Sequence, residues 1–120
     1  MNRQQVEAVV RRYYETVDSP TPADVVDLFA NDAVYRRPGY EPMVGREALL
    51  GFYDRRRVIA EGTHELLGVL VGAPDRAAVE GRFSGRLRDG SSVTLGFADF
   101  FTVKEDLIIE RSTYFETPTV

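Results

Sequence analysis

Asp99 lies in an apolar stretch where a carboxyl group could do unusual acid–base chemistry. In an extended strand, Phe97 and Phe101 share the face of Asp99, because alternate side chains point to the same side. Apolar neighbours disfavour the ionised carboxylate and favour the protonated acid. A neutral Asp99 could donate a hydrogen bond to a carbonyl oxygen and stabilise an enolate or alkoxide. The alternative, which the sequence leaves open, is a buried aspartate satisfied within the protein.

Arginines on other segments bear on the state of Asp99. In residues 107–116, Arg111 and Thr113 share one face of a predicted strand. If Arg111 or Arg82 reaches Asp99, the aspartate is ionised and paired, and it no longer acts as a donor.

Alternation divides residues 77–87 into an apolar face and a polar face. The polar face carries Glu80, Arg82, Ser84 and Arg86. These side chains either contribute to a site or form a ladder that faces solvent or a dimer partner. We favour the ladder for Arg86 and leave both interpretations open for Glu80 and Arg82.

His64 is the single histidine of the chain. It could shuttle protons at the mouth of a pocket, although a lone histidine is more often structural, which is the interpretation we favour. The chain has no cysteine, and its carboxylates do not stand at metal-ligand spacing. No phosphate-binding glycine loop, dinucleotide fingerprint or Ser-His-Asp arrangement occurs. We therefore expect no metal and no cofactor.

Hydrophobic periodicity predicts three helices followed by long strands. The helices are expected over residues 2–17, 21–30 and 46–60, and the strands over residues 64–71, 77–87, 92–103 and 107–116. Asp89-Gly90 marks a tight hairpin between the second and third strands. This order predicts an α+β fold in which helices pack on one face of a curved antiparallel sheet.

Length and charge restrict the class of protein. A chain of 120 residues with 43% hydrophobic content fits a single domain, residues 1–120. The formal net charge of −4 and the absence of a concentrated basic face argue against nucleic acid as a partner. No apolar run approaches the roughly 20 residues of a membrane span, and no secretory signal is visible. We expect a cytoplasmic protein without a membrane partner.

Several short motifs occur in an order that resembles a known superfamily. They are residues 8–13 (Ala-Val-Val-Arg-Arg-Tyr), residues 28–34, Pro38, Glu41-Pro42, Gly45, Phe52-Tyr53, residues 98–101 (Ala-Asp-Phe-Phe) and Tyr114-Phe115. This order resembles bacterial ketosteroid isomerases and the wider nuclear transport factor 2-like group, which includes SnoaL-like polyketide cyclases and limonene-epoxide-hydrolase-like enzymes. The resemblance implies a cone-shaped sheet with three N-terminal helices around an apolar pocket, and a homodimer packed through the outer sheet face.

The resemblance assigns roles to individual residues. Tyr13 matches the oxyanion-hole tyrosine, Asp99 the oxyanion-hole acid, and Tyr53 the tyrosine that supports Tyr13. The general base of the isomerases stands just before the loop proline, where this chain has Arg37 next to Pro38. The base is therefore missing. Arg37 either binds an anionic or carbonyl group of a ligand or pairs at the rim with Asp32 or Glu41, and we slightly favour the rim pair.

The same comparison places further side chains in the pocket. An ungapped match points Glu80, Arg82, Ser84 and Arg111 inward, and Asp99, an arginine and Glu80 around a water would resemble the epoxide-hydrolase arrangement. Thr113 stands where that arrangement has its second carboxylate. The predicted catalytic residues are Tyr13, Asp99, Glu80 and Arg111. The predicted substrate-binding residues are Arg37, Tyr53, Arg82, Phe52, Phe97, Phe101 and Thr113.

Two functions follow as hypotheses. The first is a cofactor-independent enzyme of isomerase, cyclase or epoxide-hydrolase type that acts on a small apolar organic ligand and is not a true ketosteroid isomerase. The second is a non-catalytic ligand-binding or dimerisation module that has lost the base.

Overall fold

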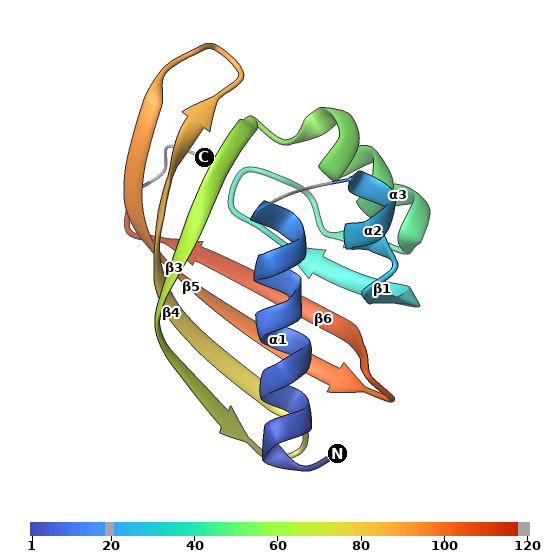
Figure 1. Cartoon of the computed structure of the whole chain (residues 1–120). Helices are drawn as coiled ribbons and strands as arrows, with labels where there is room; N and C mark the ends of the chain where they lie inside the picture. The colour runs from blue at the N-terminus through green and yellow to red at the C-terminus, as the bar shows by residue number, and fades with distance from the viewer. Residues whose placement is uncertain (19–20, 118–120) are drawn as a thin grey trace.

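The amphipathic N-terminal segment forms one long helix, α1 (Arg3–Asp18). Its buried side chains recur at helical spacing and form a single stripe: Val6, Val10, Tyr13, Tyr14 and Val17. The computed structural model describes residues 1–18 and 21–117. Figure 1 shows α1 lying across one face of a sheet, and it contacts β3, β4 and β5.

The second and third helices are shorter than the sequence pattern predicts. Helix α2 spans Pro22–Val26, and Phe29, which the pattern places on a helix, begins strand β1 (Phe29–Arg36). Helix α3 (Arg46–Gly51) continues as one π-helical turn, η1 (Phe52–Arg56), and ends there. The predicted end at residue 60 is wrong because Ile59 already pairs with Leu87 in the sheet.

Six strands form one sheet in the order β2-β1-β6-β5-β4-β3. The remaining strands are β2 (Met43–Val44), β3 (Ile59–Gly72), β4 (Arg76–Leu87), β5 (Ser92–Lys104) and β6 (Leu107–Phe115). Strand β1 runs parallel to β6, and every other neighbouring pair is antiparallel. The α+β fold with a cone-shaped curved sheet and N-terminal helices is confirmed.

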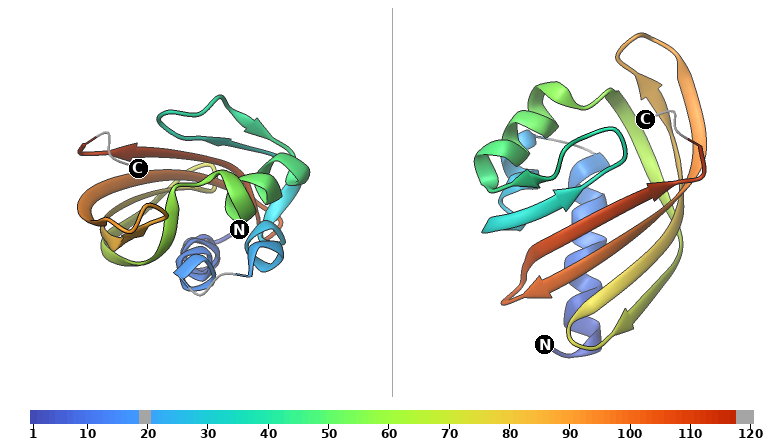
Figure 2. Two further views of the ribbon diagram at one scale, coloured as in Figure 1. Left: turned by 90° about the horizontal axis from the view of Figure 1, so that it is seen from above. Right: turned by 180° about the vertical axis from the view of Figure 1, so that it is seen from behind.

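Glycines permit the sharp curvature of β3 and β4. A Cβ added at Gly81 would lie 2.5 Å from the ring of Phe97, and one added at Gly62 would lie 2.3 Å from the ring of Phe83. The two rings therefore lie directly against the bare backbone on the concave side. Figure 2 shows the result, a sheet that curls around α1 instead of lying flat behind it.

The concave face of the sheet is the buried face. Strand β5 turns Phe97, Asp99 and Phe101 inward, and all three are buried, as the alternation predicts. The outer face exposes several large hydrophobic side chains: Leu67, Leu70, Phe100 and Tyr114. Within the described residues, no helix has the length and hydropathy to cross a membrane.

Candidate functional site

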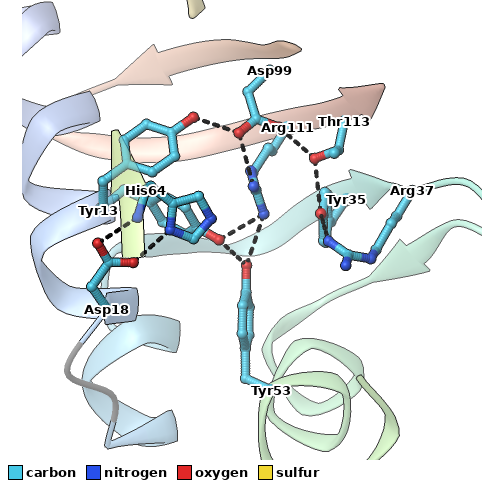
Figure 3. Close-up of polar contacts among 10 residues, drawn as sticks. Tyr13, Asp18, Tyr35, Arg37, Tyr53, His64, Asp99, Arg111 and Thr113 are labelled. Carbon is cyan, nitrogen blue, oxygen red and sulfur yellow. Dashed lines mark hydrogen bonds and ion pairs between the residues drawn. The ribbon is translucent and has the colours of Figure 1, made fainter. Parts of the chain in front are cut away.

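A buried ion pair between Asp99 and Arg111 lies at the centre of the cone (Figure 3). Nη2 of Arg111 donates to Oδ2 of Asp99 at 2.9 Å, and Arg111 and Asp99 are 3% and 0% exposed. Antiparallel pairing of β5 with β6 sets Asp99 opposite Thr113 and Phe101 opposite Arg111, which brings the two charges to neighbouring strands. Burial acts to lower the pKa of Arg111, but Asp99 and the neighbouring phenols together outweigh burial and raise that pKa well above its ordinary value.

Asp99 accepts hydrogen bonds instead of donating one. The hydroxyl of Tyr14 donates to Oδ2 and the hydroxyl of Thr113 donates to Oδ1, in addition to the guanidinium of Arg111. Three donors on one carboxyl group stabilise its ionised form. Of the two alternatives left open by the sequence, the structure supports the ion pair with Arg111, and the interpretation of Asp99 as a neutral oxyanion donor is wrong.

Tyr13, Tyr53 and Arg111 form a second cluster of donors. The two phenol oxygens lie 2.7 Å apart, and Nη1 of Arg111 donates to Tyr13 at 2.6 Å and to Tyr53 at 3.2 Å. Burial raises the pKa of Tyr13 well above its ordinary value and raises that of Tyr53, although the charge of Arg111 acts in the opposite direction. Both phenols are therefore neutral donors at ordinary pH. The predicted support of Tyr13 by Tyr53 is present.

Arg37 is inside the cone, so the interpretation of a rim pair with Asp32 or Glu41 is wrong. Alternation along β1 and into the residue that follows it buries Ala33, Tyr35 and Arg37 on one face. Nη1 of Arg37 donates to the hydroxyl of Tyr35 at 3.0 Å, and Tyr35 in turn bonds to Thr113 at 2.8 Å. The tyrosine thus links Arg37 to the side chains around Asp99.

Tyr13, Tyr53, Arg37 and Arg111 line one partly open cavity of about 20 Å³, roughly the space of one water molecule. Its walls come from α1, the end of β1, η1, β3 and β6. The lining residues are Tyr13, Val17, Arg37, Phe52, Tyr53, Arg57, Ile59, His64 and Arg111. The two predicted residues Phe97 and Phe101 pack behind this wall, against the rings of Tyr14 and Tyr13.

His64 lines this cavity and is held by Asp18, the last residue of α1. Nδ1 of His64 lies 2.5 Å from Oδ1 of Asp18, and the backbone N–H of His64 donates to Oδ2 at 2.9 Å. The imidazole packs among the rings of Tyr14, Phe83 and Phe97. Because Nδ1 is engaged, Nε2 is the nitrogen available to a ligand.

The prediction that Glu80 and Arg82 point into the pocket is wrong. Strand β4 buries Val79 and Phe83 and exposes Glu80, Arg82 and Ser84. The side chain of Arg82 is 53% exposed and lies 4.0 Å from Glu116 on the outer face. The apolar face of the strand packs inward because that arrangement removes the larger hydrophobic area from water. Neither Glu80 nor Arg82 contacts Asp99.

Four residues of the site were not singled out from the sequence. Tyr14 lies four residues after Val10 on the buried stripe of α1, and Tyr35 alternates with Ala33, so periodicity could have found both. Arg57 was not singled out because it belongs to the charged run Arg55-Arg56-Arg57, within the helix predicted over residues 46–60. Asp18 meets His64 across 46 residues, and no local signal indicates such a pair. Among the described residues, no three histidine or acidic side chains gather to hold a metal ion.

Comparisons with solved structures show the same fold. The epoxide hydrolase/cyclase-like enzyme SalBIII, described in pyran ring formation in the polyether salinomycin, superposes with a TM-score of 0.85 at 19% identity over 97% of this chain and 94% of that one. A nuclear transport factor 2-like protein from Burkholderia pseudomallei K96243 gives a TM-score of 0.83 at 18% identity, covering 97% and 92% of the two chains.

A third structure carries a small ligand. It is a protein with a ketosteroid isomerase-like fold from Catenulispora acidiphila DSM 44928 in complex with trimethylamine, with a TM-score of 0.78 at 19% identity over 88% and 83% of the chains. No curated protein sequence matches this chain. The sequence profile of the SnoaL-like domain, however, matches residues 10–111, which is most of the chain. This protein belongs to the SnoaL-like domain family.

Proposed function

We propose that this protein is a cofactor-independent enzyme of isomerase, cyclase or epoxide-hydrolase type that acts on a small metabolite inside the cone. The observation that carries the proposal is the convergence of Tyr13, Tyr53, Arg111 and His64 on one cavity. Polar donors and a proton acceptor that meet in one small cavity are the arrangement expected of acid–base catalysis.

The two tyrosines supply a hydrogen-bond donor for a developing oxyanion. Tyr13 and Tyr53 share one hydrogen bond, in which either oxygen can donate, so one of the two phenol protons remains free for a ligand. Nη1 of Arg111 donates to both oxygens and strengthens the remaining O–H as a donor. This donor would hold the oxygen of a carbonyl, alkoxide or epoxide as negative charge builds on it.

His64 supplies the base that is missing at position 37. Asp18 fixes the ring through Nδ1 and stabilises the imidazolium that forms when Nε2 accepts a proton. The protonated ring can return that proton to another atom of the same substrate, as an isomerisation or cyclisation requires. Asp99 acts through Arg111, whose orientation it fixes, and is therefore a positioning residue.

The cavity size supports a small substrate and argues against a steroid. Pockets for drug-sized ligands measure about 300–1,000 Å³, whereas this cavity measures about 20 Å³. A ligand of a few heavy atoms would enter only with movement of lining side chains such as Phe52 and Arg57. We therefore propose a compact metabolite with an apolar body, and not a ketosteroid.

The same small volume favours one alternative function. A cone filled by its own side chains would suit a ligand-binding or dimerisation module without turnover. Under that alternative His64 and Asp18 would only tie β3 to the end of α1.

We also propose that the protein forms a homodimer through the outer sheet face. Leu67 and Tyr114 line a hollow of about 370 Å³ on that face, together with Glu80, Arg82 and Glu116. Exposed apolar side chains rimmed by charges of both signs fit a surface that meets a second copy of itself.

Deuterium exchange tests the enzymatic proposal across several classes of substrate at once. Small ketones, β,γ-unsaturated ketones and hydroxy-epoxides are incubated with the protein in D2O, and NMR measures α-deuteration, double-bond migration or ring formation. We expect turnover with at least one class, and a loss of about 10²-fold or more in His64→Gln and Tyr13→Phe. The matched control is Glu105→Gln at the exposed β5–β6 turn, which should keep full activity.

Two results would count against the enzyme. Turnover by His64→Gln at the wild-type rate would show that His64 is not the base. An absence of exchange in every class, with the ligands bound, would favour the binding module.

A further inference from the structure

The interior of the cone holds more positive than negative charge. Among the described residues, the buried charged side chains are three arginines and one aspartate: Arg37, Arg57, Arg111 and Asp99. Asp99 is occupied by Arg111, Tyr14 and Thr113. The next carboxylate at the cavity, Asp18, is bound to His64. Two guanidinium groups at one cavity are thus left without a carboxylate.

Arg37 and Arg57 are these two groups, each 7% exposed. Nη1 of Arg37 bonds to Tyr35, while its Nε and Nη2 are buried and have no hydrogen-bond partner in the part of the chain that the structure describes. The guanidinium of Arg57 makes no hydrogen bond or ion pair with any described residue, and its carbon lies 5.9 Å from the ring centre of Tyr53. Both side chains line the cavity that Tyr13, Tyr53 and His64 also line.

A buried cation without a counter-charge is costly, so such a group is retained only where something compensates it. Burial acts to lower the pKa of both arginines. At Arg37 the neighbouring phenols of Tyr35 and Tyr13 together more than offset burial, so its pKa is raised. The pKa of Arg57 remains lowered by burial, and the charge of Arg37 acts in the same direction. An anion in the cavity would supply the counter-charge that both guanidinium groups lack.

Two aromatic rings orient the guanidinium of Arg37. Its guanidinium carbon lies 5.3 Å from the ring centre of Phe52 and 4.9 Å from that of Phe115. These contacts fix the guanidinium plane and leave its Nε and Nη2 edge unpaired, the edge that binds a carboxylate through two parallel hydrogen bonds.

We infer that the ligand of this cone is a small monocarboxylate, whose carboxylate binds between Arg37 and Arg57 while its reacting part meets Tyr13, Tyr53 and His64. The inference rests on the proposed function for the role of the reacting part. A planar carboxylate is smaller than a tetrahedral phosphate, so it would need less movement of the lining side chains to enter this cavity. A substrate anchored at one end by its charge would place its reacting carbon at a fixed distance from the base.

Calorimetric titration of the full chain tests the binding step separately from turnover. In buffer free of carboxylates and phosphate, the protein is titrated with acetate, isobutyrate and benzoate, and with the matching amides as neutral controls of the same shape. We expect each bound carboxylate to bind at least ten times more tightly than its amide. Inorganic phosphate, as a separate arm, should bind more weakly than the best carboxylate.

Variants locate the binding to the two arginines. Arg37→Met and Arg57→Met should each weaken carboxylate binding at least tenfold, and Arg57→Lys should recover part of it, because a point charge replaces the bidentate group. Arg36→Gln, one residue away but exposed, should bind like the wild type. Circular dichroism verifies that each variant folds, and if one arginine variant does not fold, the other alone tests the site.

The outcomes separate the inference from the proposed function. Equal affinity for carboxylates and amides, unchanged binding in a folded Arg37→Met or Arg57→Met, or tighter phosphate binding would overturn the carboxylate site. His64→Gln should lose turnover and still bind carboxylates more tightly than their amides. Carboxylate binding without any turnover would defeat the enzyme and keep the site. His64-dependent turnover of neutral ketones without any carboxylate binding would defeat the site and keep the enzyme.

Discussion

Replacing Asp99 with leucine or with alanine distinguishes an ion pair from a neutral acid. Either substitution leaves Arg111 as an unpaired buried cation and removes the acceptor of Tyr14 and Thr113. Breaking a buried pair in this way costs roughly 3–5 kcal/mol of folding free energy. Alanine adds a cavity to that loss, but the charge dominates, so both variants should be strongly and similarly destabilised. A neutral Asp99 would instead make leucine much better tolerated than alanine, whose cavity alone costs about 1–3 kcal/mol.

The assay is urea denaturation followed by far-ultraviolet circular dichroism, since the chain has no tryptophan. A domain of this size has a total stability of about 5–15 kcal/mol, so the variants should fold but unfold at much lower urea. The double variant Asp99→Leu with Arg111→Met removes both charges and should be more stable than Asp99→Leu alone, because no charge is left unpaired. Two results would refute the ion-pair reasoning. One is a free energy of unfolding of Asp99→Leu within about 1 kcal/mol of the wild type, and the other is a double variant that is no more stable than Asp99→Leu.

Three further predictions follow from the described geometry. Sedimentation at micromolar concentration should show a dimer that Tyr114→Glu, on the outer sheet face, dissociates; a wild-type monomer would contradict it. Burial raises the pKa of Tyr13 and Tyr14 in the folded protein, so the unfolded chain releases these protons first. The contribution of the two tyrosines to stability should therefore be constant below pH about 10 and fall above it, and Tyr14→Phe should reduce this fall. A β,γ-unsaturated ketosteroid should give no growth of enone absorbance, and efficient turnover would show that a steroid enters the cone.

The alternation of side chains along a strand predicted burial correctly wherever apolar residues occupy the inward face. Phe97 and Phe101 predicted that Asp99 is buried, and this is confirmed because strand period and hydrophobic burial act together there. For β4 the same alternation predicts that Glu80 is exposed, but the ungapped match to the isomerases placed Glu80 in the pocket. The error shows that the physical pattern of this chain outweighs a match carried over without its insertions and deletions.

Other parts of the site depend on tertiary structure that the sequence does not encode locally. Arg57 enters the cone because the helical segment ends at Arg56 and residue 57 adopts extended backbone angles, φ −69° and ψ 142°. The Asp18–His64 pair likewise requires α1 to end beside β3, which only the packing of the cone establishes.

The position of the base decides which reactions this cone could support. Arg37 follows β1, whereas His64 lies on β3, and these strands stand near opposite edges of the sheet. On the proposed function, the chain therefore exchanges the roles found in the isomerases: a cation occupies the position of the base, and the proton acceptor comes from the other edge. A substrate held at one end by Arg37 and at its oxygen by Tyr13 would present a different carbon to the base than a ketosteroid does. On the two proposals, the fold keeps its oxyanion donor and changes both the substrate charge and the site of proton transfer, and Arg37 and Arg57 provide the affinity for the carboxylate.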